Sequence, residues 1–222
     1  MEKMSSRKDK FNEYTLLASD ILNKNWNFCP YVWADGVFTK AETEKIIRGF
    51  DDYIPGDAGV GRSTDKPRDE DDYETDSSIR SSEVGWIDYS KNKYNWIYDR
   101  IAMKMEEIND AFYGFDLVEP YLFQYFQVAK YNVNDHYTWH TDSTGGDQSI
   151  RRLSFTVLLN DPKEYEGGEL QIFNGETNPK MNQEIKQGSI IIFPSFEWHR
   201  VTPVTKGTRI SLVGWCLGNA MK

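Results

Sequence analysis

The clearest helical pattern in the chain runs from Ile97 to Phe112. Its apolar residues recur at steps of four and three, which puts them on one face of an α-helix: Ile97, Ile101, Met105, Ile108 and Phe112. A second helix is predicted from Thr39 to about Phe50, because Thr39 and the glutamate three residues later have the spacing of a capping box. A shorter amphipathic pattern over 14–22 predicts one more helix nearer the N-terminus.

After Pro120 the pattern changes to short β-rich segments separated by turn residues. The predicted strands are 122–131, 153–159, 169–173, 189–193 and 210–215. A further strand is predicted over Ile79–Ile87. Helices followed by a run of strands predict a mostly β fold with supporting helices, in which a β-sandwich or jelly roll packs against the N-terminal helices. We expect a single domain over 1–222, with helical support in 1–117 and the β core in 118–222.

The segment 55–78 differs from its surroundings in composition. It begins with glycine-rich sequence and continues into an acidic run with few apolar residues. Long loops of this kind are usually either functional or disordered. We predict a mobile surface loop here, and whether it also closes over a substrate stays open.

Composition narrows the class of protein. With 222 residues the chain can form a substantial core, and its net charge of −9 argues against a nucleic-acid backbone as the main partner, although a local basic patch stays possible. Two cysteines, Cys29 and Cys216, are too few for a disulfide framework and fit a reducing compartment. The N-terminal residues lack the apolar centre of a signal peptide, and no apolar run is long enough to cross a membrane. We therefore expect a soluble, cytoplasmic protein.

The candidate chemistry lies between residue 131 and residue 209. In an extended segment His140 and Asp142 point to the same side, because alternate side chains share a face. His199 follows an apolar run and adds a second imidazole. Two imidazoles and one carboxylate are the ligand set of non-haem Fe(II) oxygenases. A zinc hydrolase would use similar residue types, but it would not explain Arg209, ten positions after His199. His136 is out of register with these ligands and is interpreted either as a loop residue or as a residue that contacts the ligands without binding the metal.

An ordered set of motifs surrounds these residues. It consists of Tyr131-x5-Tyr137-x2-His140-x-Asp142, Leu159-Asn160-Asp161, Tyr165-Glu166-Gly167-Gly168-Glu169-Leu170, His199-Arg200-Val201-Thr202-Pro203-Val204 and Arg209. In these motifs the chain resembles the Fe(II)/2-oxoglutarate-dependent dioxygenases. Within them it resembles the prolyl-4-hydroxylase-like branch and its PKHD-type hydroxylases. The resemblance covers roughly Val118 to Leu217.

The resemblance implies a double-stranded β-helix and a cofactor set. Fe(II) would bind His140, Asp142 and His199, with 2-oxoglutarate and O2 as cosubstrates, succinate and CO2 as products, and ascorbate as a candidate reductant. Arg209 would bind the distal carboxylate of 2-oxoglutarate, because a guanidinium can grip a carboxylate through two hydrogen bonds and stays charged when buried. Tyr131 matches a tyrosine that helps to hold this cosubstrate.

The sequence departs from animal-type prolyl hydroxylases at Leu158. There a tyrosine would donate a further hydrogen bond to the distal carboxylate. Another hydroxyl must then serve in this chain, and the candidates are those of Thr156, Ser211 and Tyr131.

The resemblance also suggests residues on the substrate side. Trp215 matches a tryptophan that contacts the target proline, and Arg151 matches an arginine that faces the substrate, although the adjacent Arg152 leaves that assignment ambiguous. Tyr137 and Trp139 flank the metal motif and would line the pocket. We therefore predict hydroxylation of a proline in a peptide or protein.

Three alternatives stay open at the level of sequence. The first is a hydroxylase of a free amino acid or of another protein side chain. The second is a nucleic-acid demethylase, which would carry a second arginine six positions after the first, where this chain has Trp215. The third is an inactive jelly-roll binding module, which the intact ligand set and Arg209 disfavour. The sequence names neither the substrate nor the oligomeric state.

Overall fold

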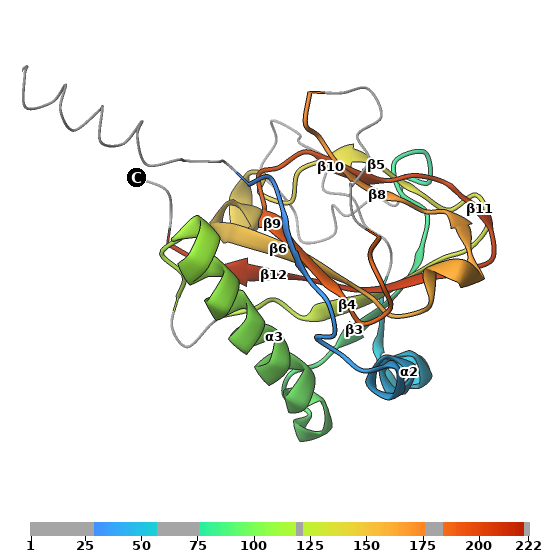
Figure 1. Cartoon of the computed structure of the whole chain (residues 1–222), viewed down its shortest axis with the longest axis horizontal. Helices are drawn as coiled ribbons and strands as arrows, with labels where there is room; N and C mark the ends of the chain where they lie inside the picture. The colour runs from blue at the N-terminus through green and yellow to red at the C-terminus, as the bar shows by residue number, and fades with distance from the viewer. Residues whose placement is uncertain (1–28, 57–75, 119–121, 176–183, 220–222) are drawn as a thin grey trace, which may run out of the picture.

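The computed structural model describes residues 29–56, 76–118, 122–175 and 184–219 (Figure 1). The helix predicted over 14–22 and most of the loop predicted over 55–78 lie outside these ranges. Two α-helices fall within them, α2 (Lys40–Arg48) and α3 (Asn95–Ile108). None of the helices in the described part of the chain has the length and apolar character needed to span a membrane.

Antiparallel strands build the rest of the fold. The largest sheet has seven strands in the order β1 (Val32–Ala34), β9 (Ile190–Pro194), β6 (Arg151–Leu158), β12 (Arg209–Leu217), β4 (Phe126–Tyr131), β3 (Glu83–Ile87) and β2 (Ile54–Gly56). A smaller sheet has three, β5 (Tyr137–His140), β10 (His199–Val201) and β8 (Leu170–Ile172), and a third pairs β11 (Val204–Lys206) with β7 (Glu166–Gly167). These strands confirm the ones predicted at 79–87 and after Pro120, although the ends of the observed strands differ from the predicted ends by a few residues.

The sheets and helices form layers. In Figure 1, α2 and α3 lie on one side of the seven-stranded sheet, and β5, β8 and β10 lie on the other side. This is the mostly β fold that was predicted, a jelly roll supported by helices. Because side chains alternate along a strand, the large sheet has two different faces. One face carries apolar residues such as Val128, Val157 and Leu212, which pack in one core with Ile101 of α3. The other face lines a pocket.

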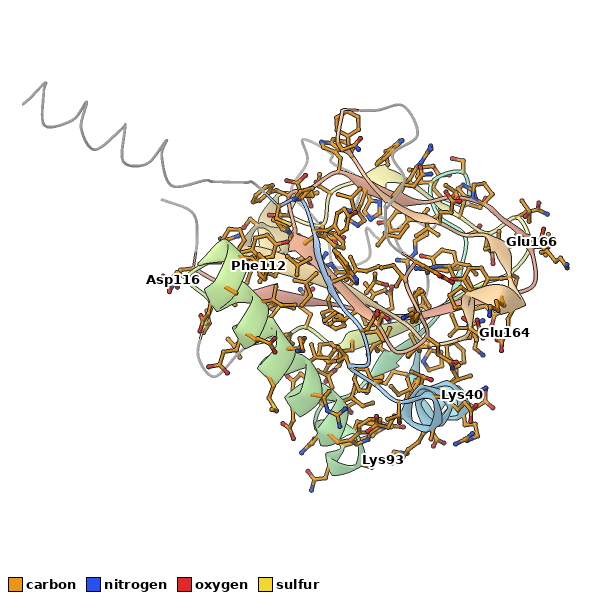
Figure 2. All side chains as sticks on the ribbon, in the orientation of Figure 1. Lys40, Lys93, Phe112, Asp116, Glu164 and Glu166 are labelled. Atoms are coloured by element: carbon orange, nitrogen blue, oxygen red, sulfur yellow. The ribbon has the colours of Figure 1, made fainter. Side chains whose placement is uncertain are left out.

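The two helices follow their sequence signals closely, with one exception. Thr39 and Glu42 form the predicted capping box of α2, and the stripe from Ile97 to Ile108 in α3 is buried. Phe112 was predicted to continue that stripe, and this is wrong, because its side chain is 58% exposed. Figure 2 labels it at the far end of the α3 ribbon. A π-helical turn over Asn109–Tyr113 has wider spacing than an α-helix, so Tyr113 packs inward instead and donates a hydrogen bond to the Ile192 carbonyl oxygen at 3.1 Å.

Candidate active site

Three potential metal ligands converge between the sheets. His140 ends β5 and pairs directly with His199, the first residue of β10, and Asp142 follows two positions after His140. The Asp142 carboxylate oxygens lie 3.7 Å from His140 Nε2 and 3.4 Å from His199 Nε2. The candidate ligand atoms all lie within 4.8 Å of one another, which is close enough to hold one ion. His136 is not part of this group, and its ring nitrogens face the carbonyl oxygens of Asn134 and Ser78.

Hydrogen bonds fix the orientation of these side chains. His140 Nδ1 lies 2.8 Å from the Thr138 carbonyl oxygen, and His199 Nδ1 lies 2.9 Å from that of Glu197. Since a carbonyl oxygen only accepts, Nδ1 carries the hydrogen in both rings and Nε2 keeps its lone pair for a metal. The carboxylate is held by Ser154, whose hydroxyl donates to Asp142 Oδ2 at 2.6 Å.

The protonation states also suit a metal. Burial, together with the neighbouring His199, lowers the pKa of His140 to about 3, so its imidazole is neutral at pH 7. Burial alone would raise the pKa of Asp142, but His199, His140, Arg151 and the Ser154 hydroxyl outweigh it and lower this pKa. A deprotonated carboxylate and neutral imidazoles are the forms that bind metal. The donor set therefore fits Fe(II) by residue type, and the protonation states of His140 and Asp142 agree with this.

Arg209 begins β12 and points into the same pocket. Only 2% of its surface is exposed, and it faces Tyr131 of β4 in register. Its Nη1 donates to Ser211 Oγ at 2.9 Å, whereas its buried Nε has no hydrogen-bond partner among the described residues. Thr156 Oγ1 is likewise buried and unpartnered within the described part, and it lines the same pocket. A buried donor without an acceptor is costly, so this end of the pocket fits a ligand with an acidic group.

Gly168 makes room for Arg209, a role that the sequence does not signal. Its φ of +61° is a left-handed conformation that favours glycine, and a Cβ atom there would lie 2.9 Å from Arg209 Cδ. In the sequence the Gly167-Gly168 pair indicates only a turn. The structure shows that this turn also leaves the space that the arginine side chain occupies.

The pocket has a volume of about 960 Å³ and is lined by all the residues predicted for metal, cosubstrate and substrate. Trp215 is one wall, and the Arg151 guanidinium lies 4.0 Å above its ring. Arg152 instead donates to the carbonyl oxygens of Ser149 and Asn219, outside the pocket. Of the two arginines, Arg151 is thus the one that lines the pocket.

The two aromatic residues that flank the metal motif have different surroundings. Tyr137 stacks on the His140 ring, with 3.5 Å between ring centres, so it supports a candidate metal ligand from one side. Trp139 lines the pocket and packs edge-on against Phe173. One further charged residue of the pocket, Arg80, was missed. It lies within the predicted strand 79–87, where nothing in the local pattern marks it as a binding residue.

Comparison with known proteins gives a consistent picture. A family model described as the 2OG-Fe(II) oxygenase superfamily matches residues 126–217. A PKHD-type hydroxylase of Crocosphaera subtropica is 41% identical over 92 residues, which cover 40% of this chain and 40% of the relative. A PKHD-type hydroxylase of Hyphomonas neptunium is 46% identical over 86 residues, which cover 36% of this chain and 37% of the relative. The chain thus matches about two fifths of the length of these curated relatives.

Solved structures resemble the whole fold at lower sequence identity. A Pseudomonas putida prolyl-4-hydroxylase superposes with a TM-score of 0.61 at 20% identity, covering 86% of this chain and 94% of that one. A Trichoplax adhaerens prolyl hydroxylase, solved with a peptide fragment of hypoxia inducible factor, superposes with a TM-score of 0.65 at 14% identity. That match covers 98% of this chain and 96% of that one. At these identities the likeness concerns the fold alone.

Proposed function

We propose that this chain, which belongs to the 2OG-Fe(II) oxygenase superfamily, is an Fe(II)- and 2-oxoglutarate-dependent hydroxylase of a proline in a peptide or protein. One observation carries the reaction class. One pocket contains both a group that could bind a metal ion, His140, Asp142 and His199, and the buried side chain of Arg209. The Nε of this arginine has no hydrogen-bond partner among the described residues. A zinc hydrolase would need the first of these features but not the second.

The metal and cosubstrate would divide the pocket between them. His140 Nε2, His199 Nε2 and an Asp142 oxygen would hold Fe(II). With O2 and 2-oxoglutarate the metal would supply the oxidising power for C–H hydroxylation, and 2-oxoglutarate would be converted to succinate and CO2. Ser154 would keep the Asp142 carboxylate in one orientation. Ascorbate stays a candidate reductant only.

Arg209 would bind the distal carboxylate of 2-oxoglutarate. Its Nη1 already donates to Ser211, which leaves Nε as a donor without a partner among the described residues. Of the three candidate hydroxyls, we favour Thr156 as the second contact. Its buried Oγ1 has no partner in the described structure, whereas Ser211 Oγ already accepts from the arginine. Tyr131 would support the guanidinium through its ring, 5.5 Å away.

The substrate side favours a flat, apolar ring. Trp215 and Trp139 offer aromatic surface in the pocket, and the Trp215 Nε1 donor is buried without a partner among the described residues. Arg151 lies over Trp215 and could bind a peptide carbonyl beside the target. The proposal of a proline substrate also draws support from the prolyl hydroxylases among the structural neighbours, one of them solved with a peptide.

The test is hydroxylation of a peptide panel. Proline-containing peptides, free amino acids and oligonucleotides are incubated with the full chain, Fe(II), 2-oxoglutarate and O2, and mass spectrometry follows the products. We expect a gain of one oxygen on proline, lost in Trp215→Ala and retained in Trp33→Ala, whose tryptophan lies in β1 outside the pocket. Oxidation of only free amino acids or only nucleic acid would overturn the substrate class.

A further inference from the structure

Arg80 is a buried cation with neutral partners. It is 7% exposed and lines the pocket. Its Nε donates to Ser82 Oγ at 3.1 Å, and its Nη2 donates to Gln127 Oε1 at 2.6 Å. Neither acceptor carries a charge, and within the described ranges no carboxylate forms an ion pair with Arg80. Among the described residues that surround this guanidinium, none therefore neutralises its charge.

Such an arrangement is costly unless a ligand completes it. Removing a cation from water carries a large penalty that a nearby anion normally offsets. The Tyr137 ring, whose centre lies 4.8 Å from Arg80 Cζ, offsets only a small part through a cation–π contact. A buried, unneutralised arginine in the wall of a pocket is thus the kind of group that binds an anion.

The backbone fixes Arg80 beside the metal group. Thr138 N donates to the Ile79 carbonyl oxygen at 2.8 Å, and Ser81 N donates to that of His136 at 3.0 Å, so both neighbours of Arg80 are bonded to the segment that contains β5. The Arg80 guanidinium lies over the Tyr137 ring, and that ring stacks on His140. An anion bound to Arg80 would therefore lie close to the position where oxidation is proposed to occur.

The charge balance of the described pocket lining leaves room for a further anion. The charged residues of its lining are Arg80, Arg151, Arg209 and Asp142, which gives an excess of positive charge although the whole chain carries −9. Bound Fe(II) and the 2-oxoglutarate dianion would cancel each other. In the proposed function the two carboxylates of 2-oxoglutarate are taken by the metal and by Arg209. None is left for Arg80.

We propose that Arg80 binds a carboxylate of the primary substrate, so that the preferred substrates carry an acidic group near the carbon that is oxidised. This inference rests on the proposed function for the location of that carbon. Two sources could supply the same chemistry: an acidic side chain next to the target in a peptide, or the α-carboxylate of a free amino acid. The size of the pocket, about 960 Å³, and its aromatic lining favour the peptide.

The experiment measures binding, so that it does not depend on turnover. The full chain is loaded with Mn(II) and 2-oxoglutarate and titrated calorimetrically with blocked proline peptides. The peptides come in pairs, one member with Glu and the other with Gln at the same position. That position lies one or two residues before or after the proline. A further pair, L-proline and L-prolinamide, tests the second source. We expect at least one acidic member to bind about tenfold more tightly than its amide, a difference that added salt reduces.

Variants of Arg80 test whether this residue causes the preference for the acidic member of a pair. In Arg80→Gln the ratio of the two dissociation constants should fall to near one, and in Arg80→Lys, which keeps the charge, it should stay above one. Arg48→Gln removes an exposed charge from α2 and should leave the ratio as it is in the wild type. Equal affinity for acid and amide in every pair, or a preference that persists in Arg80→Gln, would overturn the proposal. If the acid preference depends on Arg80 but no succinate ever forms, the carboxylate site stands and the proposed function fails.

Discussion

Arg209 and Tyr131 face each other across β12 and β4, and the guanidinium carbon lies 5.5 Å from the centre of the tyrosine ring. The ring contributes a weak attraction to the buried cation and holds it in place without occupying its hydrogen-bond donors. The arginine is therefore positioned for an acid before any acid binds. Pre-positioning of this kind lowers the entropic cost of binding.

Replacing Arg209 with Gln should weaken 2-oxoglutarate binding and leave Fe(II) binding nearly intact. Loss of one partner of a desolvated charge pair costs about 2–5 kcal/mol, which corresponds to a rise in the dissociation constant on the order of 30-fold or more. Equilibrium dialysis with labelled 2-oxoglutarate measures the change. The affinity of Arg209→Lys for 2-oxoglutarate should lie between those of the wild type and Arg209→Gln, because lysine keeps the charge but lacks the planar guanidinium. Wild-type affinity in Arg209→Gln would remove the arginine from the cosubstrate site.

The variant Thr156→Val separates binding from stability. The Thr156 hydroxyl is buried without a partner among the described residues, so a methyl group in its place should leave the free energy of unfolding equal or slightly higher. A hydrogen bond to a charged group contributes about 1.5–3 kcal/mol, so 2-oxoglutarate should bind roughly tenfold or more weakly. Urea titration and dialysis give the two values. Unchanged affinity would point to Ser211 or Tyr131 as the second contact.

Gly168→Ala should weaken 2-oxoglutarate binding by moving Arg209. The new Cβ would lie 2.9 Å from Arg209 Cδ, in addition to the cost of a positive φ. Gly36→Ala is the matched control, because Gly36 has a φ of +69° and nothing within 4 Å of the added carbon. Both variants should lose stability through backbone strain, but only Gly168→Ala should lose affinity for the cosubstrate. Equal affinities in the two variants would show that the contact with Arg209 has no role.

The wild-type protein should bind one Fe(II) ion per chain. Replacing any one of His140, Asp142 and His199 with alanine should abolish this binding. His136→Ala is the control in the same segment, because this third histidine bonds backbone carbonyl oxygens and is not part of the group. Metal content after anaerobic dialysis provides the measurement. Retention of iron by any of the three variants, or its loss in His136→Ala, would contradict the ligand set.

Acid should destabilise the metal-free protein in a way that depends on His140. Burial lowers the pKa of His140 to about 3 in the folded state, whereas an unfolded histidine titrates near 6.5. Below about pH 6.5 the unfolded chain therefore binds a proton that the folded chain does not, and the free energy of unfolding falls with pH by at most about 1.4 kcal/mol per pH unit from this group. Urea titrations at pH 7 and pH 5 should show a smaller loss in His140→Gln than in the wild type. An equal loss in both proteins would argue against the buried, neutral imidazole.

Features of the fold were predictable where they depend on residues close together in the sequence. The stripe of α3 and the capping box of α2 depend on spacings within a few turns, and both were predictable. Phe112 was not, because a π-helical turn changes the helical spacing without a residue type that marks it. The short strands β5 and β10 were also missed as strands, because their pairing, which sets His140 against His199, joins segments about sixty residues apart.

The candidate site shows the same division. The metal ligands share a recognisable spacing, and Arg209 follows them at a fixed distance. The role of Gly168 depends on its contact with the Arg209 side chain. The role of Arg80 depends on its two partners in the described structure, Ser82 and Gln127, which are both uncharged. In the sequence, a glycine in a turn motif and a lone arginine in a predicted strand do not reveal such contacts.

The most direct test of the central claim follows the oxygen atoms. The full chain is incubated with Fe(II), 2-oxoglutarate and ¹⁸O₂ together with the peptide that binds most tightly, and the succinate is examined by mass spectrometry. We expect succinate that carries one ¹⁸O atom, formed in proportion to hydroxylated peptide and absent in Asp142→Ala. Absence of labelled succinate from the wild type with metal and cosubstrate both bound, or its equal formation by Asp142→Ala, would contradict an Fe(II)/2-oxoglutarate oxygenase at this site.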